Sequence, residues 1–184
     1  MGKIRFGLIG SGWRAEFYIR IAKSLPELFE LTGVLIRDKE KGERFARQFD
    51  TVVVNTLDEL IKCNPEHVVL AIKREFVSDS LLELFERDIP VLCESPPGED
   101  LESLKKVWNQ YTEHNARIQI AEQYFAQPLY AAWENVISSG KIGEVENINI
   151  SSLHGYHGAS MIRRYLKAGY ENAVIYGKRF WFDV

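Results

Sequence analysis

The chain has 184 residues, of which 46% are hydrophobic and 27% charged, and these ordinary globular proportions exclude a disordered or collagen-like chain. The net charge of -3, from 23 basic and 26 acidic residues, provides no basic surplus for nucleic acid. No apolar run approaches the roughly 20 residues of a membrane span, the first residues do not resemble a signal peptide, and the two cysteines form no paired motif. We therefore expect a cytoplasmic protein with no membrane partner and no metal site.

Short apolar segments alternate with helical patterns along residues 1–122. The segments expected to be strands are residues 3–9, 31–36, 52–54, 68–72, 90–93 and 118–121. Apolar residues at intervals of three or four predict helices between them, as in Phe17, Ile21 and Leu25 or in Leu101, Leu104, Trp108 and Tyr111. Alternating strands and helices predict a doubly wound α/β domain with a parallel sheet. Its ligand should lie outside the carboxyl ends of the strands.

The pattern changes in residues 123–184. Pro128 and Gly140 suit the beginning and the end of one helix, and residues 161–166 indicate another. The segments that resemble strands are residues 145–153, 173–176 and 180–182. So few elements rarely form an independent core, so we expect a partial α+β second domain. Unpaired strand edges invite pairing, and we expect a homo-oligomer that buries residues 145–153 and 180–182.

The most informative motif follows the first expected strand and opens the first helix, and it comprises Gly10, Ser11, Gly12, Trp13, Arg14 and Ala15. In such a G-x-G-x-x-A pattern the first glycine permits a tight turn and the second lets the backbone approach a pyrophosphate. The alanine keeps the helix close to the strand, and the helix N-terminus favours phosphate. The motif predicts a dinucleotide site. The alternative is a close-packed turn that binds no ligand.

The end of the second expected strand bears on the choice of cofactor. The position that faces the adenosine ribose is Ile36 or Arg37, rather than Asp38. An arginine there suits a 2′-phosphate, which favours NADP over NAD. The alternative is that Arg37 and Asp38 are solvated loop charges.

Together with three later segments, the glycine motif resembles the Gfo/Idh/MocA family of NAD(P)-dependent oxidoreductases. The segments are Val91-Leu92-Cys93-Glu94-Ser95-Pro96, Ala121-Glu122-Gln123-Tyr124 followed by Pro128, and Ser139-Gly140-Lys141-Ile142-Gly143-Glu144-Val145. The resemblance implies a Rossmann nucleotide domain over residues 1–122. It implies that residues 123–184 are an incomplete substrate and oligomerisation domain, because family members continue through several more strands. The implied reaction is hydride transfer between a nicotinamide and a sugar, polyol or related hydroxy or carbonyl compound.

The resemblance also implies cofactor-binding residues. Ile72 ends the fourth expected strand and Lys73 follows it, where the carboxyl end of that strand should open on the ligand site. Glu94 and Ser95 correspond to the nicotinamide end. Ser95 replaces the family's E-K-P lysine, and a serine cannot supply that charge or an equivalent acid–base group. One hypothesis is that Lys73 or Arg74 supplies the charge. The alternative is that both are solvated loop cations.

The family's later histidine, in an H-x-x-D pattern, matches His157, with Ser160 in place of the acid. Histidine is the usual general acid or base near neutral pH, so His157 is the first candidate for the proton of the reaction, followed by His154 and Tyr156. The alternative is a capping or hydrogen-bonded histidine. Three interpretations remain open. The protein is an NAD(P)-dependent oxidoreductase acting on a small molecule, a non-catalytic dinucleotide-binding or regulatory homologue that lacks the catalytic lysine, or a degenerate homologue whose glycine loop is only structural.

Overall fold

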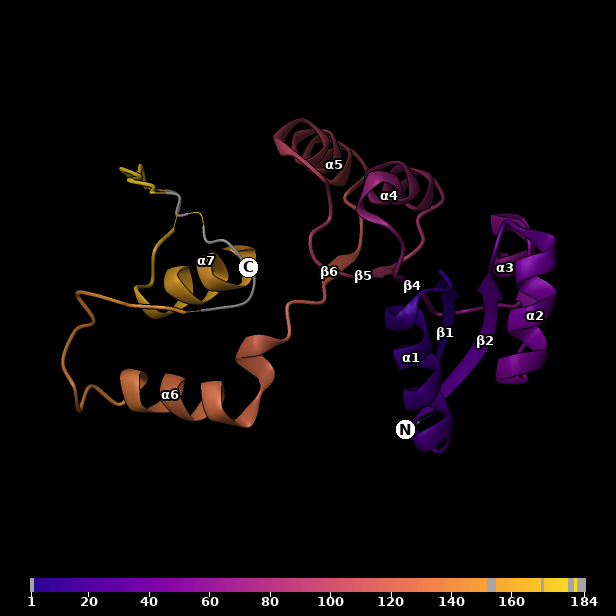
Figure 1. The fold of residues 1–184 in the computed structure, drawn as a ribbon, viewed down its shortest axis with the longest axis horizontal. Helices are drawn as coiled ribbons and strands as arrows, with labels where there is room; N and C mark the ends of the chain where they lie inside the picture. The colour runs from indigo at the N-terminus through magenta and orange to yellow at the C-terminus, as the bar shows by residue number, and fades with distance from the viewer. Residues whose placement is uncertain (1, 152–154, 170, 179–180, 182–184) are drawn as a thin grey trace. The chain divides into compact units, whose positions relative to one another are not determined.

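A computed structural model describes residues 2–151, 155–169, 171–178 and 181, and the chain forms two compact units, Met1–Glu122 and Gln123–Val184 (Figure 1). The first unit contains a six-stranded parallel sheet in the order β3-β2-β1-β4-β5-β6. Its strands are β1 (Ile4–Ile9), β2 (Phe29–Leu35), β3 (Val53–Val54), β4 (His67–Leu70), β5 (Val91–Cys93) and β6 (Ile118–Ile120). The strand order reverses between β1 and β4, and ligands of open α/β sheets bind at such a reversal.

Helices cover both faces of this sheet, which confirms the predicted doubly wound fold. The helices are α1 (Trp13–Ser24) and α2 (Lys39–Phe49) on one face, and α3 (Leu57–Lys62), α4 (Val77–Glu86) and α5 (Leu101–His114) on the other. Strand β4 supplies Val69 to the core under α1 and Val68 and Leu70 to the core under α4. All three side chains are buried because successive residues of a strand point to opposite faces.

Helix α1 exists as predicted, but its buried face differs from the expected one. The buried residues are Ala15, Ile19 and Ala22, whereas Phe17 and Leu25 are exposed. The chain enters α1 directly after β1, so the helix lies close to the sheet and small residues fit between them. An interval of four residues predicts a helix but does not decide which of its faces packs.

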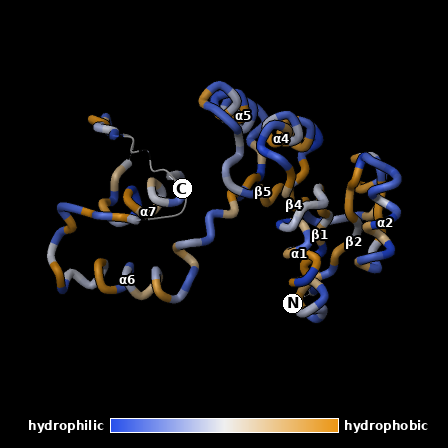
Figure 2. The backbone as a smooth tube through the Cα atoms, in the orientation of Figure 1, coloured by the Kyte–Doolittle hydropathy of each residue, from blue (hydrophilic) through white to orange (hydrophobic). Residues whose placement is uncertain are grey.

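Helix α5 shows the same difference. Val107 is its buried residue, whereas Leu101 and Trp108, which predicted the helix, are 66% and 60% exposed. Figure 2 shows both hydrophobic and hydrophilic stretches along this helix. The packing side is set by contact with α4 and not by the longest apolar stripe.

Helix α3 was not predicted, although its sequence carries a signal. Thr56 and Glu59 form a capping box: the Thr56 hydroxyl accepts from the Glu59 amide at 3.2 Å, and the Glu59 carboxylate accepts from the Thr56 amide at 3.1 Å. A Thr followed three residues later by Glu is a known helix-start pattern. The Glu59 carboxylate also accepts from the Asn55 amide at 2.8 Å, and this bond, followed by the one from the Thr56 amide, lowers the pKa of Glu59.

The second unit contains α6 (Pro128–Ser138) and α7 (Gly155–Tyr165), preceded by a short 3-10 turn, η2 (Tyr124–Ala126). Helix α6 begins at Pro128 as predicted, and Gly140 follows its end with a φ of 71°. The predicted strands over residues 145–151 and 173–176 are wrong, because these residues form no strand. A strand needs a hydrogen-bonded neighbour, and no described residue of this unit provides one. Residues 152–153, Phe180 and Phe182 lie outside the described part.

None of the helices formed by the described residues is both long and apolar enough to cross a membrane.

Candidate functional site

The glycine loop turns at the reversal of strand order. Gly10 directly follows β1 and has a φ of 133°, a backbone conformation that favours glycine. A Cβ atom on Gly10 would lie 2.1 Å from the carbonyl oxygen of Ala71, which follows β4. Any side chain would collide with that backbone. Glycine is therefore required for the chain to leave β1 beside the end of β4.

Gly12, in contrast, is not explained by packing within the chain. It is the N-cap residue of α1 and contributes no side-chain cap. A Cβ atom on Gly12 would meet nothing within 4 Å, so packing within the chain does not explain this glycine. The open space fits a group that approaches the backbone as closely as a pyrophosphate does. Ser11 is half-buried beside it, and Trp13 is 77% exposed.

Arg14 and Ala15 complete the first turn of α1. Ala15 is fully buried and holds the helix against the sheet. Arg14 turns toward the end of β5, where its Nε atom donates to Oε1 of Glu94 at 2.7 Å. Each side chain of this ion pair is 19% exposed. The first turn of α1 thus carries a cation that is held in place by the residue following β5.

Tyr18 joins this pair. Its hydroxyl donates to the same Glu94 oxygen at 2.6 Å. Burial, and then the hydrogen bond to the Glu94 carboxylate, raise the pKa of Tyr18, so the phenol stays protonated and continues to donate. The Arg14 guanidinium also lies 4.8 Å from the Phe17 ring and 5.8 Å from the Tyr18 ring, within the range of cation–π attraction.

A cavity of about 220 Å³ lies at the carboxyl ends of β1, β2 and β3. Its lining comprises Ile9, Leu35, Arg37, Asn55, Thr56, Leu57, Ser80, Glu83 and Leu84. Ligand pockets for drug-sized molecules occupy about 300–1,000 Å³, so this cavity fits one end of a dinucleotide and not the whole.

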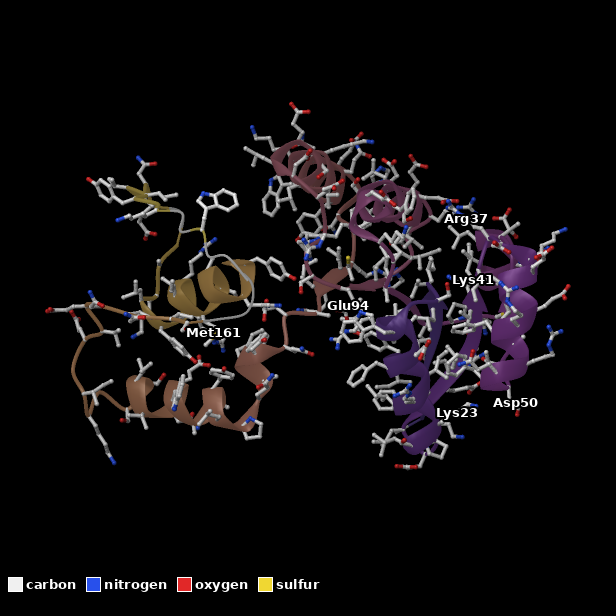
Figure 3. The ribbon with its side chains drawn as sticks, in the orientation of Figure 1. Lys23, Arg37, Lys41, Asp50, Glu94 and Met161 are labelled. Carbon is white, nitrogen blue, oxygen red and sulfur yellow. The ribbon has the colours of Figure 1, made fainter. Side chains whose placement is uncertain are left out.

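The three residues that follow β2 have different roles, and one of them lines this cavity. Ile36 is buried, and its amide donates to Val54 at 2.9 Å. Arg37 lines the cavity and pairs with Glu83 at 3.8 Å. Asp38 caps α2 by accepting from the Lys41 amide at 2.9 Å. Arg37, labelled in Figure 3, is the charged residue that the end of β2 presents to the cavity.

The remaining candidates in the first unit lie after β4 and β5. Ile72 is half-buried, and its Cγ2 atom lies 3.4 Å from the position of a Cβ on Gly10. The Lys73 side chain is 81% exposed and pairs with Glu75 at 3.8 Å, and Arg74 begins the short turn η1 (Arg74–Phe76). Ser95 is half-buried after Glu94. Arg14 contacts Glu94, whereas Lys73 pairs with Glu75.

The expected catalytic residues belong to the second unit. His157 lies within α7 and is 9% exposed. Its ring centroid lies 4.3 Å from that of Tyr156 and 4.7 Å from that of Tyr124. His154 lies outside the described residues. Over the ranges that the structure covers, His, Cys, Asp and Glu side chains do not gather in threes as metal ligands.

Several residues at these sites were not predicted. Tyr18 follows Arg14 by four residues, so the helix places both on one face, and this spacing was an available signal. Glu83 and Ser80 reach the cavity only because α4 packs on the sheet, and Tyr124 reaches His157 across more than 30 residues. Local sequence carries no signal for these tertiary contacts.

Residues 4–122 match the family described as an oxidoreductase family with an NAD-binding Rossmann fold, Gfo/Idh/MocA. The chain is 27% identical over 148 residues to D-xylose 1-dehydrogenase (NADP(+)) of Haloarcula marismortui, covering 77% of this chain and 41% of that protein. It is 29% identical over 146 residues to inositol 2-dehydrogenase 4 of Saccharopolyspora erythraea, covering 78% of this chain and 42% of that protein. The chain thus spans 41–42% of the length of these two relatives.

A solved structure shares the fold. The chain superposes with a TM-score of 0.73 on an oxidoreductase from Agrobacterium radiobacter in complex with NAD+, L-tartaric acid and magnesium. The superposition covers 89% of this chain and 55% of that one, at 18% sequence identity.

Proposed function

Because the chain belongs to the Gfo/Idh/MocA oxidoreductase family, we propose that its first unit binds NADP or NAD. We further propose that the protein transfers a hydride between this cofactor and a sugar, polyol or related hydroxy or carbonyl compound. The observation that supports the proposal is the glycine loop, which follows β1 beside the end of β4. Packing within the chain requires Gly10 but does not explain Gly12, which leaves space for a ligand. When bound, a nicotinamide supplies or accepts the hydride, and the protein orients the reactants.

The proposed roles in the first unit follow from position. The backbone at Gly12 and the first turn of α1 hold the pyrophosphate. Arg37 holds the adenosine end, because it lines the cavity after β2. Glu94 and Ser95 lie beyond β5 and face the nicotinamide end. Arg14 is a positioning residue that joins the glycine loop to Glu94.

In the second unit we propose that His157 moves the proton of the reaction, with Tyr156 beside it. The support is chemical: an imidazole exchanges a proton near neutral pH. His157 is held by the rings of Tyr156 and Tyr124, so its orientation is defined by its neighbours.

The substrate class and the cofactor rest on the relatives. Their names specify D-xylose, inositol and NADP(+), and the solved neighbour binds NAD+. A sugar or polyol is the shared chemistry. Arg37 favours the 2′-phosphate of NADP, so NADP is our preferred cofactor.

A second function is favoured by Ser95. The chain has no lysine at this position, and the neighbouring Lys73 pairs with Glu75 at the surface. A non-catalytic dinucleotide-binding or regulatory protein would keep the glycine loop and lose the reaction. Both functions require the nucleotide site.

We also propose a cytoplasmic homo-oligomer, supported by α6 and no longer by the strand edge expected at residues 145–153, since residues 145–151 form no strand. Helix α6 exposes Leu129, Trp133 and Val136 at 58%, 47% and 48%, and their spacing places them on one face. Light scattering at micromolar concentration tests the assembly. A monomer would contradict it.

Calorimetric titration of the chain with NADPH and with NADH tests the proposed function. Binding of either nucleotide with a micromolar dissociation constant supports it, and a screen of sugars and polyols for nicotinamide reduction then separates the enzyme from the binding protein. Absence of binding by both nucleotides, in a folded protein, would show that the glycine loop is only structural.

A further inference from the structure

One acidic side chain faces the cation that is expected to recognise the 2′-phosphate. Glu83, on α4, lines the same cavity as Arg37. Its Oε2 atom lies 3.8 Å from Nη2 of Arg37, and its Oε1 atom lies 3.6 Å from Nη2 of Arg87. The two carboxylate oxygens thus face two different guanidinium groups.

Helix α4 and helix α3 hold Glu83 in this position. Arg87 follows Glu83 by one turn of α4, and it also pairs with Asp58 on α3. The hydrogen bond to Asp58, and after it the charges of Glu83 and Glu86, raise the pKa of Arg87. Arg87 therefore keeps the Glu83 carboxylate at the cavity and already has a second acid as partner.

We propose that Glu83 determines how strongly this site prefers NADPH over NADH. The inference rests on the proposed dinucleotide site. A 2′-phosphate carries two negative charges and needs the Arg37 guanidinium. Glu83 competes for that guanidinium and repels the phosphate, so it weakens NADPH binding. NADH has no phosphate at this position, so the carboxylate opposes its binding less.

The expected effect is modest because the pair is open to solvent. The Arg37 and Glu83 side chains are 71% and 40% exposed. Exposed charge pairs have small effects, so Glu83→Gln is expected to raise the affinity for NADPH relative to NADH about 1.5-fold to fivefold. Salt screens such charges, so the change in this ratio should shrink between about 0.05 M and about 0.5 M sodium chloride.

The test is calorimetric titration of wild-type chain, Glu83→Gln and Glu86→Gln with NADPH and with NADH. Glu86 lies on the same helix, is exposed, acts on Arg87 and does not line the cavity, so Glu86→Gln removes an equal charge beside Arg87 but outside the cavity. The proposal expects the NADPH preference to rise in Glu83→Gln alone. Circular dichroism confirms that each variant is folded.

A double variant tests the route through Arg37. The gain from Glu83→Gln should be smaller in an Arg37→Gln background, because the guanidinium for which the two anions compete is gone. An equal gain for both nucleotides, an equal effect of Glu86→Gln, or an undiminished gain without Arg37 would overturn the inference and leave the proposed function intact. If the wild-type chain binds neither nucleotide, both this inference and the proposed function are wrong.

Discussion

Arg14 and Glu94 are 80 residues apart in the sequence and are joined by a hydrogen bond of 2.7 Å between Nε and Oε1. The bond ties the first turn of α1 to the end of β5, across the intervening end of β4. The amide of Glu94 also donates to Leu70 at 3.0 Å. The first turn of α1, which completes the glycine motif, is therefore held in place by Glu94, a residue outside that motif.

Removing the charge of Glu94 should destabilise the first unit. Glu94→Gln weakens the bonds from both Arg14 and Tyr18, and hydrogen bonds to charged groups contribute about 1.5–3 kcal/mol. Since the pair is partly exposed, we expect a loss of about 1–2 kcal/mol in the free energy of unfolding. Urea denaturation followed by circular dichroism measures it.

The matched control is Glu16→Gln. Glu16 pairs with Arg20 at 3.4 Å along the outer side of α1, and the Arg20 side chain is 73% exposed. Such pairs contribute about 0.3–0.5 kcal/mol. Equal losses for Glu94→Gln and Glu16→Gln would contradict a bracing role for Glu94.

The two glycines of the loop should respond differently to alanine. A Cβ on Gly12 meets nothing within 4 Å, so Gly12→Ala should fold normally yet bind NADPH and NADH at least tenfold more weakly, because the methyl group occupies the space proposed for the pyrophosphate. Gly10→Ala should instead destabilise the fold, since its Cβ would lie 2.1 Å from the Ala71 carbonyl oxygen.

Thermal unfolding and calorimetric titration separate these two effects. Gly2→Ala is the control, because a Cβ there also meets nothing and Gly2 precedes the opposite end of β1. Undiminished nucleotide affinity in Gly12→Ala would rule out this loop as the pyrophosphate site.

His67 should make stability depend on pH. Burial in β4 lowers its pKa below the usual value of about 6.5, so the unfolded chain binds the proton more readily. His67 therefore reduces stability least above about pH 7, where it is neutral in both states. The free energy of unfolding falls as the pH drops through about 6.5 toward the lower pKa of His67 in the folded state. Denaturant titrations between about pH 7.5 and about pH 5 measure the slope.

In His67→Gln the free energy of unfolding should depend less on pH. The quantity compared is this pH dependence and not the stability at a single pH. His114→Gln is the control, because His114 is exposed at the end of α5. An unchanged slope in His67→Gln would show that the proton is bound elsewhere.

Ser95→Lys should separate the two proposed functions. A lysine after Glu94 restores the cation that serine cannot supply. If the chain is a damaged oxidoreductase, nicotinamide reduction in the presence of sugars or polyols should rise at least tenfold over wild type. If it is a binding protein, the variant should bind nucleotide and remain inactive. Ser24→Lys, at the exposed end of α1, controls for added charge.

Much of the first unit could be read from local sequence. The alternation of apolar runs and helical intervals predicts the parallel sheet and its two helical layers, because each element's period is set by a few neighbouring residues. The glycine motif predicts the tight turn, and Gly10 has a positive φ. The segment 145–151 shows the limit: its alternation suits a strand, but no described neighbour pairs with it.

Tertiary structure decided which side chains meet. Sequence predicted α1 from Phe17 and Leu25, yet the buried residues are Ala15, Ile19 and Ala22, because closeness to β1 selects the helix face. Arg14 meets Glu94 because the carboxyl ends of parallel strands lie at one edge of the sheet, whereas Arg37 meets Glu83 because α4 packs on that sheet. Periodicity along the chain predicts the helices and strands, whereas contacts between residues 46 or 80 positions apart depend on how those elements pack.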